Sequence, residues 1–241
     1  MQQAVSTRSH YAVDGAGTRT LELLQVAQSY NRWIVDRLRP GIGSRVLEVG
    51  CGKGAITTLL DDRELLVGVD VVPEFIAELK ARYENRANVR FLLHDLTHGA
   101  GELAPERFDS AVSVNVFEHI EDDVAAMKGV FDALQPDGTF ALLVPAHPAL
   151  MGACDEAVGH WRRYTKATLR DKLLRAGFEV VQLRYSNPLG ALGWLVNSKL
   201  LGRPELGGVG LFDRLVPALR LVDSLPWPFG LQLIAIAKKP C

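Results

Sequence analysis

The chain lacks the features that mark secreted, metal-ligating and membrane-spanning proteins. Only three of its 241 residues are cysteine, at positions 51, 154 and 241. They have no spacing typical of a metal site, and three cysteines cannot all pair, so a reducing cytosol is the simpler setting. No apolar run approaches the roughly 20 residues of a membrane-spanning helix, and the N-terminus has no apolar core of a secretory signal. We therefore expect a soluble, cytoplasmic protein.

An excess of charge of one sign is also missing. The 27 basic and 28 acidic side chains give a formal net charge of −1. Without a general basic field, nucleic acid is not an expected partner. The content of 48% hydrophobic and 23% charged residues suits one α/β domain with some additional segments and a substantial buried core.

Strand-like and helix-like segments alternate along most of the chain. Apolar, strand-like segments lie at 45–50, 65–71, 89–96, 108–116, 139–146, 179–185 and 231–239. Segments with helical spacing lie at 19–40, 55–62, 73–85, 121–134 and 166–178. This alternation predicts βαβ units, and hence a parallel sheet that is covered on both faces.

A glycine-rich turn, Gly50-Cys51-Gly52-Lys53-Gly54-Ala55, follows the first expected strand. A phosphate-binding P-loop needs a serine or threonine after its lysine, to ligate magnesium. Here Gly54 follows Lys53, so the P-loop interpretation fails.

The dinucleotide-binding fingerprint is matched more closely. Gly50, Gly52 and Ala55 fit the pattern G-x-G-x-x-G/A, and Asp70 lies twenty residues beyond Gly50, at the end of the next strand. Glycines allow a ligand to approach the backbone, and a carboxylate accepts hydrogen bonds from ribose. Because any bound nucleoside benefits from both, this match does not name the cofactor.

Two carboxylates help to separate the candidate cofactors. Glu48 lies two residues before the first glycine, where it would repel a pyrophosphate and stabilise an ammonium or sulfonium group. Asp95 ends the third strand and provides an acceptor for an adenine amino group. NAD(P) nevertheless stays open as an alternative at this point.

The successive motifs "VLEVGCGKG", "VGVDVVPEFI", "FLLHDL", "FDSAVSVNVFEHIEDD", "LQPDGTFALLVP" and "LLRAGFEVV" resemble those of class I S-adenosylmethionine-dependent methyltransferases, over roughly residues 20–185. "DEAVGHWRRYT", which contains a GHxRRYT segment, resembles a feature of a bacterial subgroup. The resemblance implies an α/β fold, a Rossmann-like three-layer sandwich with a seven-stranded, mostly parallel sheet and an antiparallel last strand. It also implies S-adenosyl-L-methionine as cofactor, S-adenosyl-L-homocysteine as product, and no metal ion.

The resemblance also assigns roles at the cofactor site. Glu48, Gly50 and Gly52 would contact the methionine part, Asp70 the ribose and Asp95 the adenine. Asn115, with Val116 and Phe117, would border the methionine amine and the methyl group. The expected cofactor-binding residues are Glu48, Gly50, Gly52, Asp70, Val71, Asp95, Leu96 and Asn115.

Two histidines are candidates for a general base, since the pKa of histidine lies near neutral pH. His119 follows the fourth strand, close to the expected position of the methyl group, and Glu118 is an alternative to it. His160 lies in the segment expected to cover the acceptor. The expected acceptor-binding residues are His160, Arg163, Tyr164, Tyr30 and Trp33.

Each of these acceptor contacts has a structural alternative. Arg162, Arg163 and Tyr164 would grip an acidic acceptor, or else one arginine would pair with Asp155 or Glu156 and fix the loop. Tyr30 and Trp33, together with Tyr11, would form a lid, although Trp33 also suits the core.

We divide the chain into an N-terminal helical arm or lid (1–40), a cofactor-binding core (41–186), a helical insertion (187–228) and the last strand (229–241). In the insertion, Leu211, Phe212, Leu215, Val216, Leu219 and Val222 fall near one helical face. A core or homodimer face explains this pattern best; an acceptor-pocket wall and a membrane contact are alternatives. Only Arg214 and Arg220 line the other side, which is few for an anionic membrane.

The sequence thus predicts a methyltransferase that acts on a small molecule of apolar or lipid-like character by in-line displacement. A NAD(P)-dependent oxidoreductase and a non-catalytic S-adenosylmethionine-binding protein are the alternatives.

Overall fold

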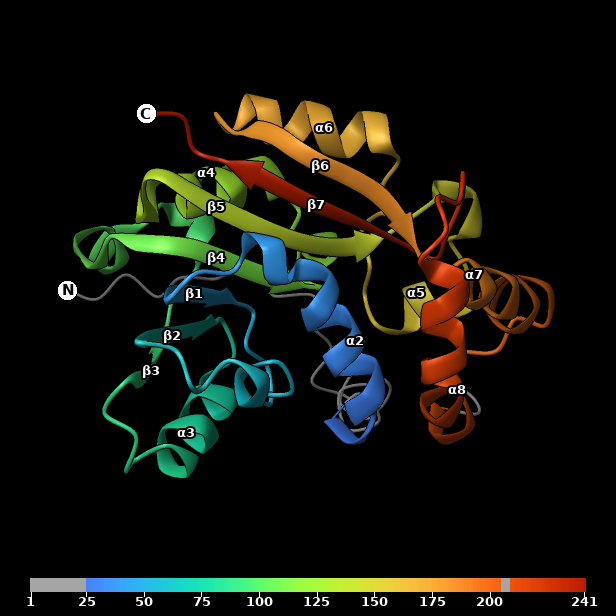
Figure 1. The fold of residues 1–241 in the computed structure, drawn as a ribbon, viewed down its shortest axis with the longest axis horizontal. Coiled ribbons are helices and arrows are strands. Elements are labelled where there is room, and N and C mark those ends of the chain that lie inside the picture. Colours follow the sequence, from blue (N-terminus) through green and yellow to red (C-terminus); the bar gives the residue numbers. More distant parts are fainter. Residues whose placement is uncertain (1–24, 205–208) are drawn as a thin grey trace.

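A computed structural model describes residues 25–204 and 209–241 of the chain. Seven strands form one sheet in the order β3-β2-β1-β4-β5-β7-β6, in which β7 runs antiparallel to both of its neighbours (Figure 1). The strands are β1 Arg45–Val49, β2 Leu65–Asp70, β3 Val89–Leu93, β4 Phe108–Val114, β5 Leu134–Pro145, β6 Glu179–Ser186 and β7 Gln232–Lys238. The predicted seven-stranded sheet with an antiparallel last strand is confirmed.

Helices cover both faces of the sheet, because successive strand residues point to opposite sides. Leu47 and Val67 pack on the layer formed by α4 (Asp123–Ala133) and α6 (Lys166–Arg175). Val46 and Leu66 face the opposite layer. That layer consists of α2 (Gln28–Leu38), α3 (Pro73–Arg82) and α8 (Val209–Asp223). The result is the expected three-layer sandwich with two apolar cores.

One predicted helix is wrong. Residues 55–62 form only a short 3-10 turn, Thr57–Leu59, in place of an α-helix. Thr57 is fully buried, and its hydroxyl donates a 2.7 Å hydrogen bond to Glu48 Oε2. Two adjacent β-branched threonines are poor helix formers. The hydrogen bond from Thr57 to Glu48 therefore competes successfully with a helix at this position.

The expected helix over 19–40 is only partly present in the described residues. Ala27 has a non-helical ψ of 63°, and α2 begins at Gln28. The first part of the expected arm, including Tyr11, lies outside the described residues.

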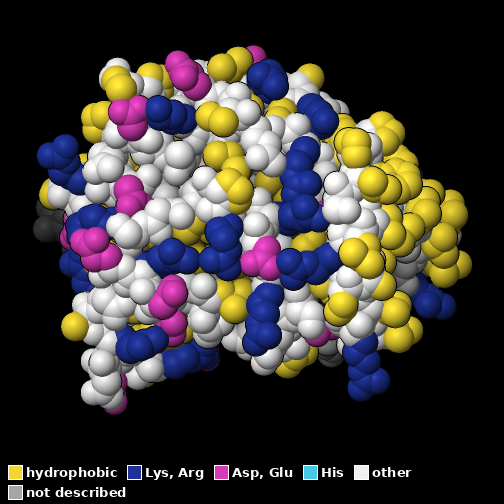
Figure 2. All heavy atoms as spheres, in the orientation of Figure 1, with side chains coloured by type: hydrophobic (Ala, Val, Ile, Leu, Met, Phe, Trp, Pro, Cys, Tyr) yellow, Lys and Arg dark blue, Asp and Glu magenta, His cyan; other side chains and the backbone are white. Residues whose placement is uncertain are grey.

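The segment between β6 and β7 contains α7 (Pro188–Trp194), a π-helical turn (Leu195–Leu200) and α8. These helices lie beside one end of the sheet, near α5 (Ala153–Ala157) (Figure 1). Figure 2 shows many hydrophobic side chains gathered on the surface at this end. None of the described helices is long and apolar enough to cross a membrane.

Candidate active site

A cavity of about 1110 Å³ lies at the carboxyl ends of β1, β2 and β4. Parallel α/β sheets commonly bind ligands at this edge. All eight residues expected to bind the cofactor line this cavity: Glu48, Gly50, Gly52, Asp70, Val71, Asp95, Leu96 and Asn115. Residues of α2, α7, α8 and the loop before α6 also contribute to its lining. One chamber therefore brings the expected cofactor residues and the insertion together.

The backbone N–H groups of the glycine turn are used within the protein. Gly50 N and Cys51 N donate to Val69 O at 2.8 and 3.1 Å, and Gly52 N donates to Asp70 Oδ2 at 2.8 Å. A dinucleotide pyrophosphate instead requires free N–H groups at the N-terminus of a helix. No α-helix occurs within residues 50–64. The turn therefore disfavours the dinucleotide alternative.

Close packing explains the first glycine of the turn. Gly50 has a φ of +73°, and a Cβ atom built there would lie 2.3 Å from Val116 Cγ2. A side chain at position 50 would both strain the backbone and displace the loop that follows β4. This glycine keeps the turn against the loop that carries Asn115.

Glu48 provides a buried acid at the end of β1. Burial raises its pKa to about 8, against the lowering effect of the Thr57 hydrogen bond, and the nearby Asp70 charge raises it further. A cation placed beside Glu48 would stabilise the ionised form. This environment suits the ammonium or sulfonium group of a cofactor better than a phosphate.

Asp70 is held at the end of β2 by two backbone groups. Its Oδ2 accepts from Gly52 N, and its Oδ1 accepts from Val72 N at 3.1 Å. Burial raises the pKa of Asp70 in spite of these bonds. Each carboxylate oxygen retains a further lone pair, so two adjacent ribose hydroxyls could donate to it.

Asp95 and Asn115 complete the edge of the chamber. Asp95 Oδ1 accepts from both the backbone N and the hydroxyl of Thr97, at 2.9 and 2.7 Å. These bonds cap the 3-10 turn Leu96–His98. Asn115 has a φ of +53° and donates its backbone N–H to Leu143 O at 3.0 Å. Asn tolerates this left-handed conformation better than most residues do.

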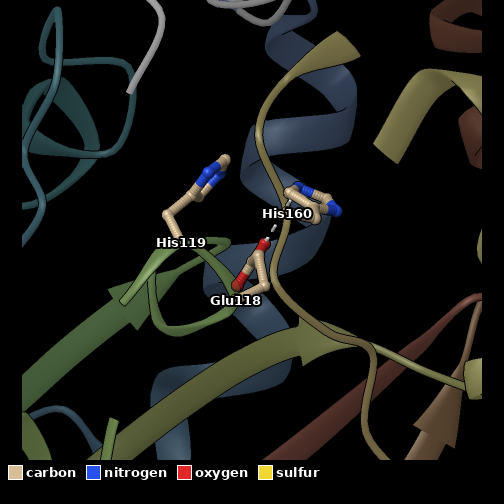
Figure 3. A group of neighbouring side chains, drawn as sticks. All are labelled: Glu118, His119 and His160. Atoms are coloured by element: carbon tan, nitrogen blue, oxygen red, sulfur yellow. Dashed lines mark ion pairs between the residues drawn. The ribbon is translucent and has the colours of Figure 1, made fainter. Parts of the chain in front are cut away.

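Glu118, His119 and His160 come together beside the chamber, and both histidines line it (Figure 3). His160 Nδ1 lies 2.7 Å from Asp155 Oδ1, and His160 Nε2 lies 3.8 Å from Glu118 Oε1. An ionised carboxylate only accepts hydrogen bonds, so Nδ1 carries a hydrogen and the neutral ring has its lone pair on Nε2. The side chain of His160 lines the cavity.

Burial shifts the pKa of both neighbours of His160. Burial raises the pKa of Glu118 to about 7, and both of its carboxylate oxygens lack a hydrogen-bond partner within the described residues. Burial lowers the pKa of His119 to about 3, with His160 contributing. The His119 ring packs edge-on against His160, with 4.6 Å between the centroids. His119 is therefore neutral at physiological pH.

Three expected acceptor contacts have structural roles. Arg163 lines the cavity, but its Nε donates to Asp155 Oδ1 at 2.8 Å and its side chain is almost fully buried. This is the loop-fixing ion pair that we considered as the alternative. Trp33 is 2% exposed, belongs to the core below α2 and does not line the cavity.

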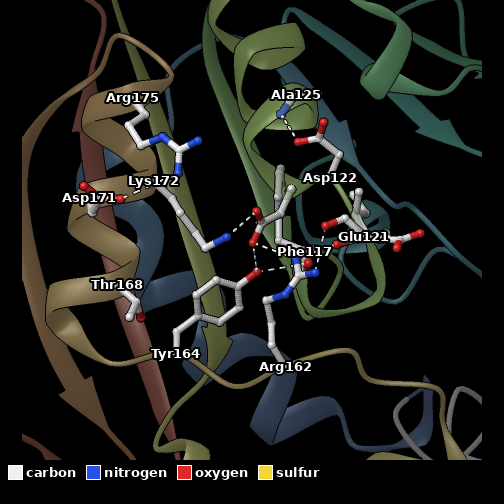
Figure 4. A network of polar contacts seen from close by, with 12 residues as sticks. Phe117, Glu121, Asp122, Ala125, Arg162, Tyr164, Thr168, Asp171, Lys172 and Arg175 are labelled. Atoms are coloured by element: carbon white, nitrogen blue, oxygen red, sulfur yellow. Dashed lines mark hydrogen bonds and ion pairs between the residues drawn. The ribbon is translucent and has the colours of Figure 1, made fainter.

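Tyr164 also lies away from the cavity. Its hydroxyl donates to Asp123 Oδ2 at 2.7 Å and lies 3.0 Å from Phe117 O (Figure 4). Arg162 and Lys172 form ion pairs with the same aspartate, at 2.8 and 2.6 Å. The contacts of Tyr164 and Arg162 therefore fasten the GHxRRYT segment to the start of α4, and the predicted acceptor contact of Tyr164 is wrong.

Tyr30 does line the cavity, from α2. Its ring packs edge-on against Phe212 of α8, with 5.6 Å between centroids. Its hydroxyl accepts a hydrogen bond from Gln232 at the start of β7. These contacts join α2 to the insertion across the chamber.

Sequence reasoning missed the wall contributed by α7 and by Trp161. Leu189 and Trp194 of α7 line the cavity, and Trp161 lines it with 41% of its surface exposed. The Arg163 guanidinium lies over the Trp194 ring, 4.6 Å from its centroid. The sequence offered a signal for Trp161, which is an aromatic residue between His160 and the two arginines. It offered none for α7, because the direction of that helix depends on tertiary packing.

The fold and this edge of the sheet are similar to those of class I S-adenosylmethionine-dependent methyltransferases. Residues 47–142 match the family described as "Methyltransferase domain", which spans β1 to most of β5. The match contains all eight expected cofactor residues, and also Thr57, the hydrogen-bond partner of Glu48.

Individual relatives agree with this class. The chain is 28% identical over 163 residues to a ubiquinone biosynthesis O-methyltransferase of Azorhizobium caulinodans, covering 61% of this chain and 63% of that protein. An S-adenosylmethionine-dependent methyltransferase from Mesorhizobium loti has a similar structure, with a TM-score of 0.61, 18% identity and coverage of 90% of this chain and 100% of that one. The N-methyltransferase NodS from Bradyrhizobium japonicum, in complex with S-adenosyl-L-homocysteine, gives a TM-score of 0.57, 18% identity and coverage of 98% and 94%.

Proposed function

We propose that the chain methylates a hydroxyl group of a small, largely apolar molecule, with S-adenosylmethionine as donor. The methionine end of the cofactor would lie beside Glu48, its ribose on Asp70 and its adenine near Asp95. The relative from Azorhizobium is named an O-methyltransferase, which supports oxygen as the methylated atom.

The observation that carries the proposal is the hydrogen bond between His160 and Asp155. Asp155 Oδ1 holds both His160 Nδ1 and Arg163 Nε, and Asp155 Oδ2 accepts from Gly152 N at 3.0 Å. Asp155 therefore fixes the ring with Nε2 free to accept a proton, the arrangement that activates nucleophiles in many enzymes. In this arrangement Asp155 is a positioning residue and His160 is the base.

Methyl transfer would then take place in one displacement step. His160 Nε2 takes the hydroxyl proton of the acceptor, and the acceptor oxygen forms a bond to the methyl carbon of the sulfonium. The carbon–sulfur bond breaks, and its electron pair stays on sulfur as S-adenosylhomocysteine forms. Glu118, 3.8 Å from Nε2, stabilises the imidazolium that results. His119, whose pKa is about 3, packs against His160 and does not hold the proton.

The apolar character of the acceptor follows from the far wall of the chamber. That wall consists mainly of apolar side chains from α7 and α8: Leu189, Trp194, Phe212, Leu215 and Leu219. Burial of an apolar acceptor against these side chains would provide most of the binding free energy. The three cysteines are free thiols, which fits action in a reducing compartment such as the cytoplasm.

A methyl-transfer assay tests the proposal. Protein is incubated with methyl-labelled S-adenosylmethionine and a panel of phenols and alcohols that carry alkyl chains of increasing length. We expect transfer to oxygen that becomes more efficient as the chain lengthens, and at least a hundredfold slower transfer by His160→Asn. Transfer only to amines, or tight S-adenosylhomocysteine binding without transfer to any acceptor, would contradict the proposal.

A further inference from the structure

The insertion presents a large apolar surface to the outside of the molecule. Nine of the fifteen exposed large apolar side chains of the described chain lie in it: Leu189, Leu192, Val196, Leu200, Leu201, Leu211, Leu215, Leu221 and Leu225. In Figure 2 this surface appears as the hydrophobic region at the end where Figure 1 places α7 and α8. A monomeric protein rarely exposes so many neighbouring apolar side chains without a partner. We call these nine residues the apolar cap.

The apolar cap follows helical spacing on both helices. On α7 and the π-helical turn, Leu189, Leu192, Val196 and Leu200 are separated by three, four and four residues. On α8, Leu211, Leu215 and Leu221 share an outward stripe, while Phe212, Val216 and Leu219 pack inward on the core below α2. Helix α8 is thus apolar on two sides, which core packing alone does not require.

The charges of this segment favour an anionic partner. Arg203 and Arg214 are exposed, and neither forms an ion pair with a carboxylate of the described residues, whereas the exposed Lys199 donates to Ala149 O. Arg214 lies three residues after Leu211 and seven before Leu221, within the outward stripe of α8. Long basic side chains at such positions extend from an apolar surface towards charged head groups.

Two acids in the described part of this segment are turned inward. Asp213 Oδ1 accepts the backbone N–H of Tyr30 at 2.8 Å. Asp223 is 2% exposed and accepts from Ser186 Oγ and Asn187 N, at 2.9 and 2.7 Å. The described part of the apolar cap therefore combines leucine side chains and cations, and it has no outward-facing carboxylate.

The apolar cap is continuous with the acceptor chamber. Leu189 and Leu215 belong to it, with 43% and 49% of their surface exposed, and both also line the cavity. A molecule dissolved in the phase that covers the cap would reach the chamber along these two side chains. This continuity distinguishes the cap from an apolar patch placed at random.

We propose that the apolar cap docks on the surface of an anionic lipid bilayer, with α7 and α8 lying in the interface and the chamber open towards the lipid. Interfacial helices of this kind combine leucine-rich faces with basic residues. Such docking would deliver a lipid-dissolved acceptor directly to the site; that consequence, unlike the docking itself, rests on the proposed function.

Vesicle co-sedimentation tests the docking without cofactor or acceptor, so its outcome is independent of methyl transfer. We expect the wild-type protein to sediment with phosphatidylglycerol-containing vesicles, less with pure phosphatidylcholine vesicles, and less as salt is raised. Leu200→Glu and Leu211→Glu should each weaken binding by about tenfold or more. Arg203→Ala with Arg214→Ala should remove the preference for the anionic lipid.

Matched controls come from α6, which packs on the opposite face of the sheet from α8. Leu174 of α6 is 54% exposed, and Leu174→Glu should leave vesicle binding unchanged; Arg170→Ala should do the same. Equal loss in the controls, or no sedimentation of the wild type, would overturn the proposal. A wild-type dimer in light scattering that Leu211→Glu dissociates, combined with no vesicle binding, would also overturn it and would assign the cap to a second copy of the chain.

Discussion

The carboxylate of Asp155 fixes the imidazole of His160, with 2.7 Å between Asp155 Oδ1 and His160 Nδ1. The pair is joined by Arg163, whose Nε donates to the same oxygen at 2.8 Å. Burial acts to raise the pKa of Asp155, but its bonds to His160 and Arg163 hold it below the ordinary value. Asp155 therefore stays ionised, and it holds the ring of His160 in one orientation on the wall of the chamber.

Replacing His160 should impair the chemical step and not the binding of the cofactor. We expect His160→Asn to lower kcat by about a hundredfold or more, with S-adenosylhomocysteine affinity within about twofold of wild type. His119→Asn should have a much smaller effect, because His119 is already neutral. Steady-state kinetics and calorimetry measure these quantities, and an equal loss of kcat in both variants would contradict the assignment of His160.

Removal of metal ions gives a second test of the role of His160. Nitrogen and oxygen atoms of Glu118, His119 and His160 lie within 4.8 Å of one another. If His160 acts as a proton acceptor, treatment with EDTA should leave turnover unchanged. A loss of turnover that added Zn²⁺ restores would show that the cluster binds a cation instead.

Glu48 should make the stability of the cofactor-free protein depend on pH. Its folded-state pKa of about 8 lies above its ordinary value, so the folded state binds the proton more tightly than the unfolded state does. The stabilising contribution is complete below the ordinary value and is lost as pH rises through about 8. Glu48→Gln should therefore raise Tm relative to wild type at about pH 9 and much less at about pH 5.

Glu48→Gln should also weaken the binding of the cofactor. Glu48→Gln removes the charge that would face the ammonium or sulfonium group, and we expect about tenfold weaker S-adenosylmethionine binding. Thr57→Val is the matched variant, since it removes the hydrogen bond to Glu48 while keeping the charge. If Glu48→Gln stabilises the protein but leaves its affinity for S-adenosylmethionine unchanged, the cofactor does not bind beside Glu48.

Gly50 and Gly99 provide a matched pair for the packing of the glycine turn. Both have positive φ, +73° and +93°, but a Cβ at Gly50 meets Val116 at 2.3 Å, whereas a Cβ at Gly99 has no neighbour within 4 Å. Gly50→Ala should therefore lower the free energy of unfolding by about 1–3 kcal/mol more than Gly99→Ala does. Urea unfolding measures the difference, and adding Val116→Ala should recover part of it.

Tyr164 should matter for stability and not for the acceptor. Tyr164→Phe removes a buried donor from Asp123 and should lower the free energy of unfolding by about 1–3 kcal/mol, while KM for the acceptor stays unchanged. Tyr185→Phe, on β6, is the control. A higher KM in Tyr164→Phe without loss of stability would restore the acceptor contact expected from sequence.

The sheet and the cofactor edge were predictable because local patterns determine them. Strand and helix periods give the order of elements. Glu48 and Asp70 lie at the ends of β1 and β2, and Asp95 follows β3, so that all three meet at one edge of the sheet. The failures arose where tertiary contacts override the local pattern. Thr57 was read as part of a helix but hydrogen-bonds to Glu48, and Tyr164 was read as an acceptor contact but binds Asp123.

The acceptor side was less predictable for the same reason. The sequence showed the apolar residues of α8 but not which of them would pack inward, because the direction of the helix depends on its contact with α2. Phe212, Val216 and Leu219 face the core, while Leu211 and Leu215 are exposed. No local pattern separates these two sets.

Calorimetric titration with S-adenosylhomocysteine and, separately, with NAD tests the central claim most directly. The chamber formed by Glu48, Asp70 and Asp95, with no free N–H donors at Gly50 and Gly52 for a pyrophosphate, should bind S-adenosylhomocysteine, and Asp70→Ala should weaken that binding at least tenfold. NAD should give no binding heat. Binding of NAD without binding of S-adenosylhomocysteine would contradict the account.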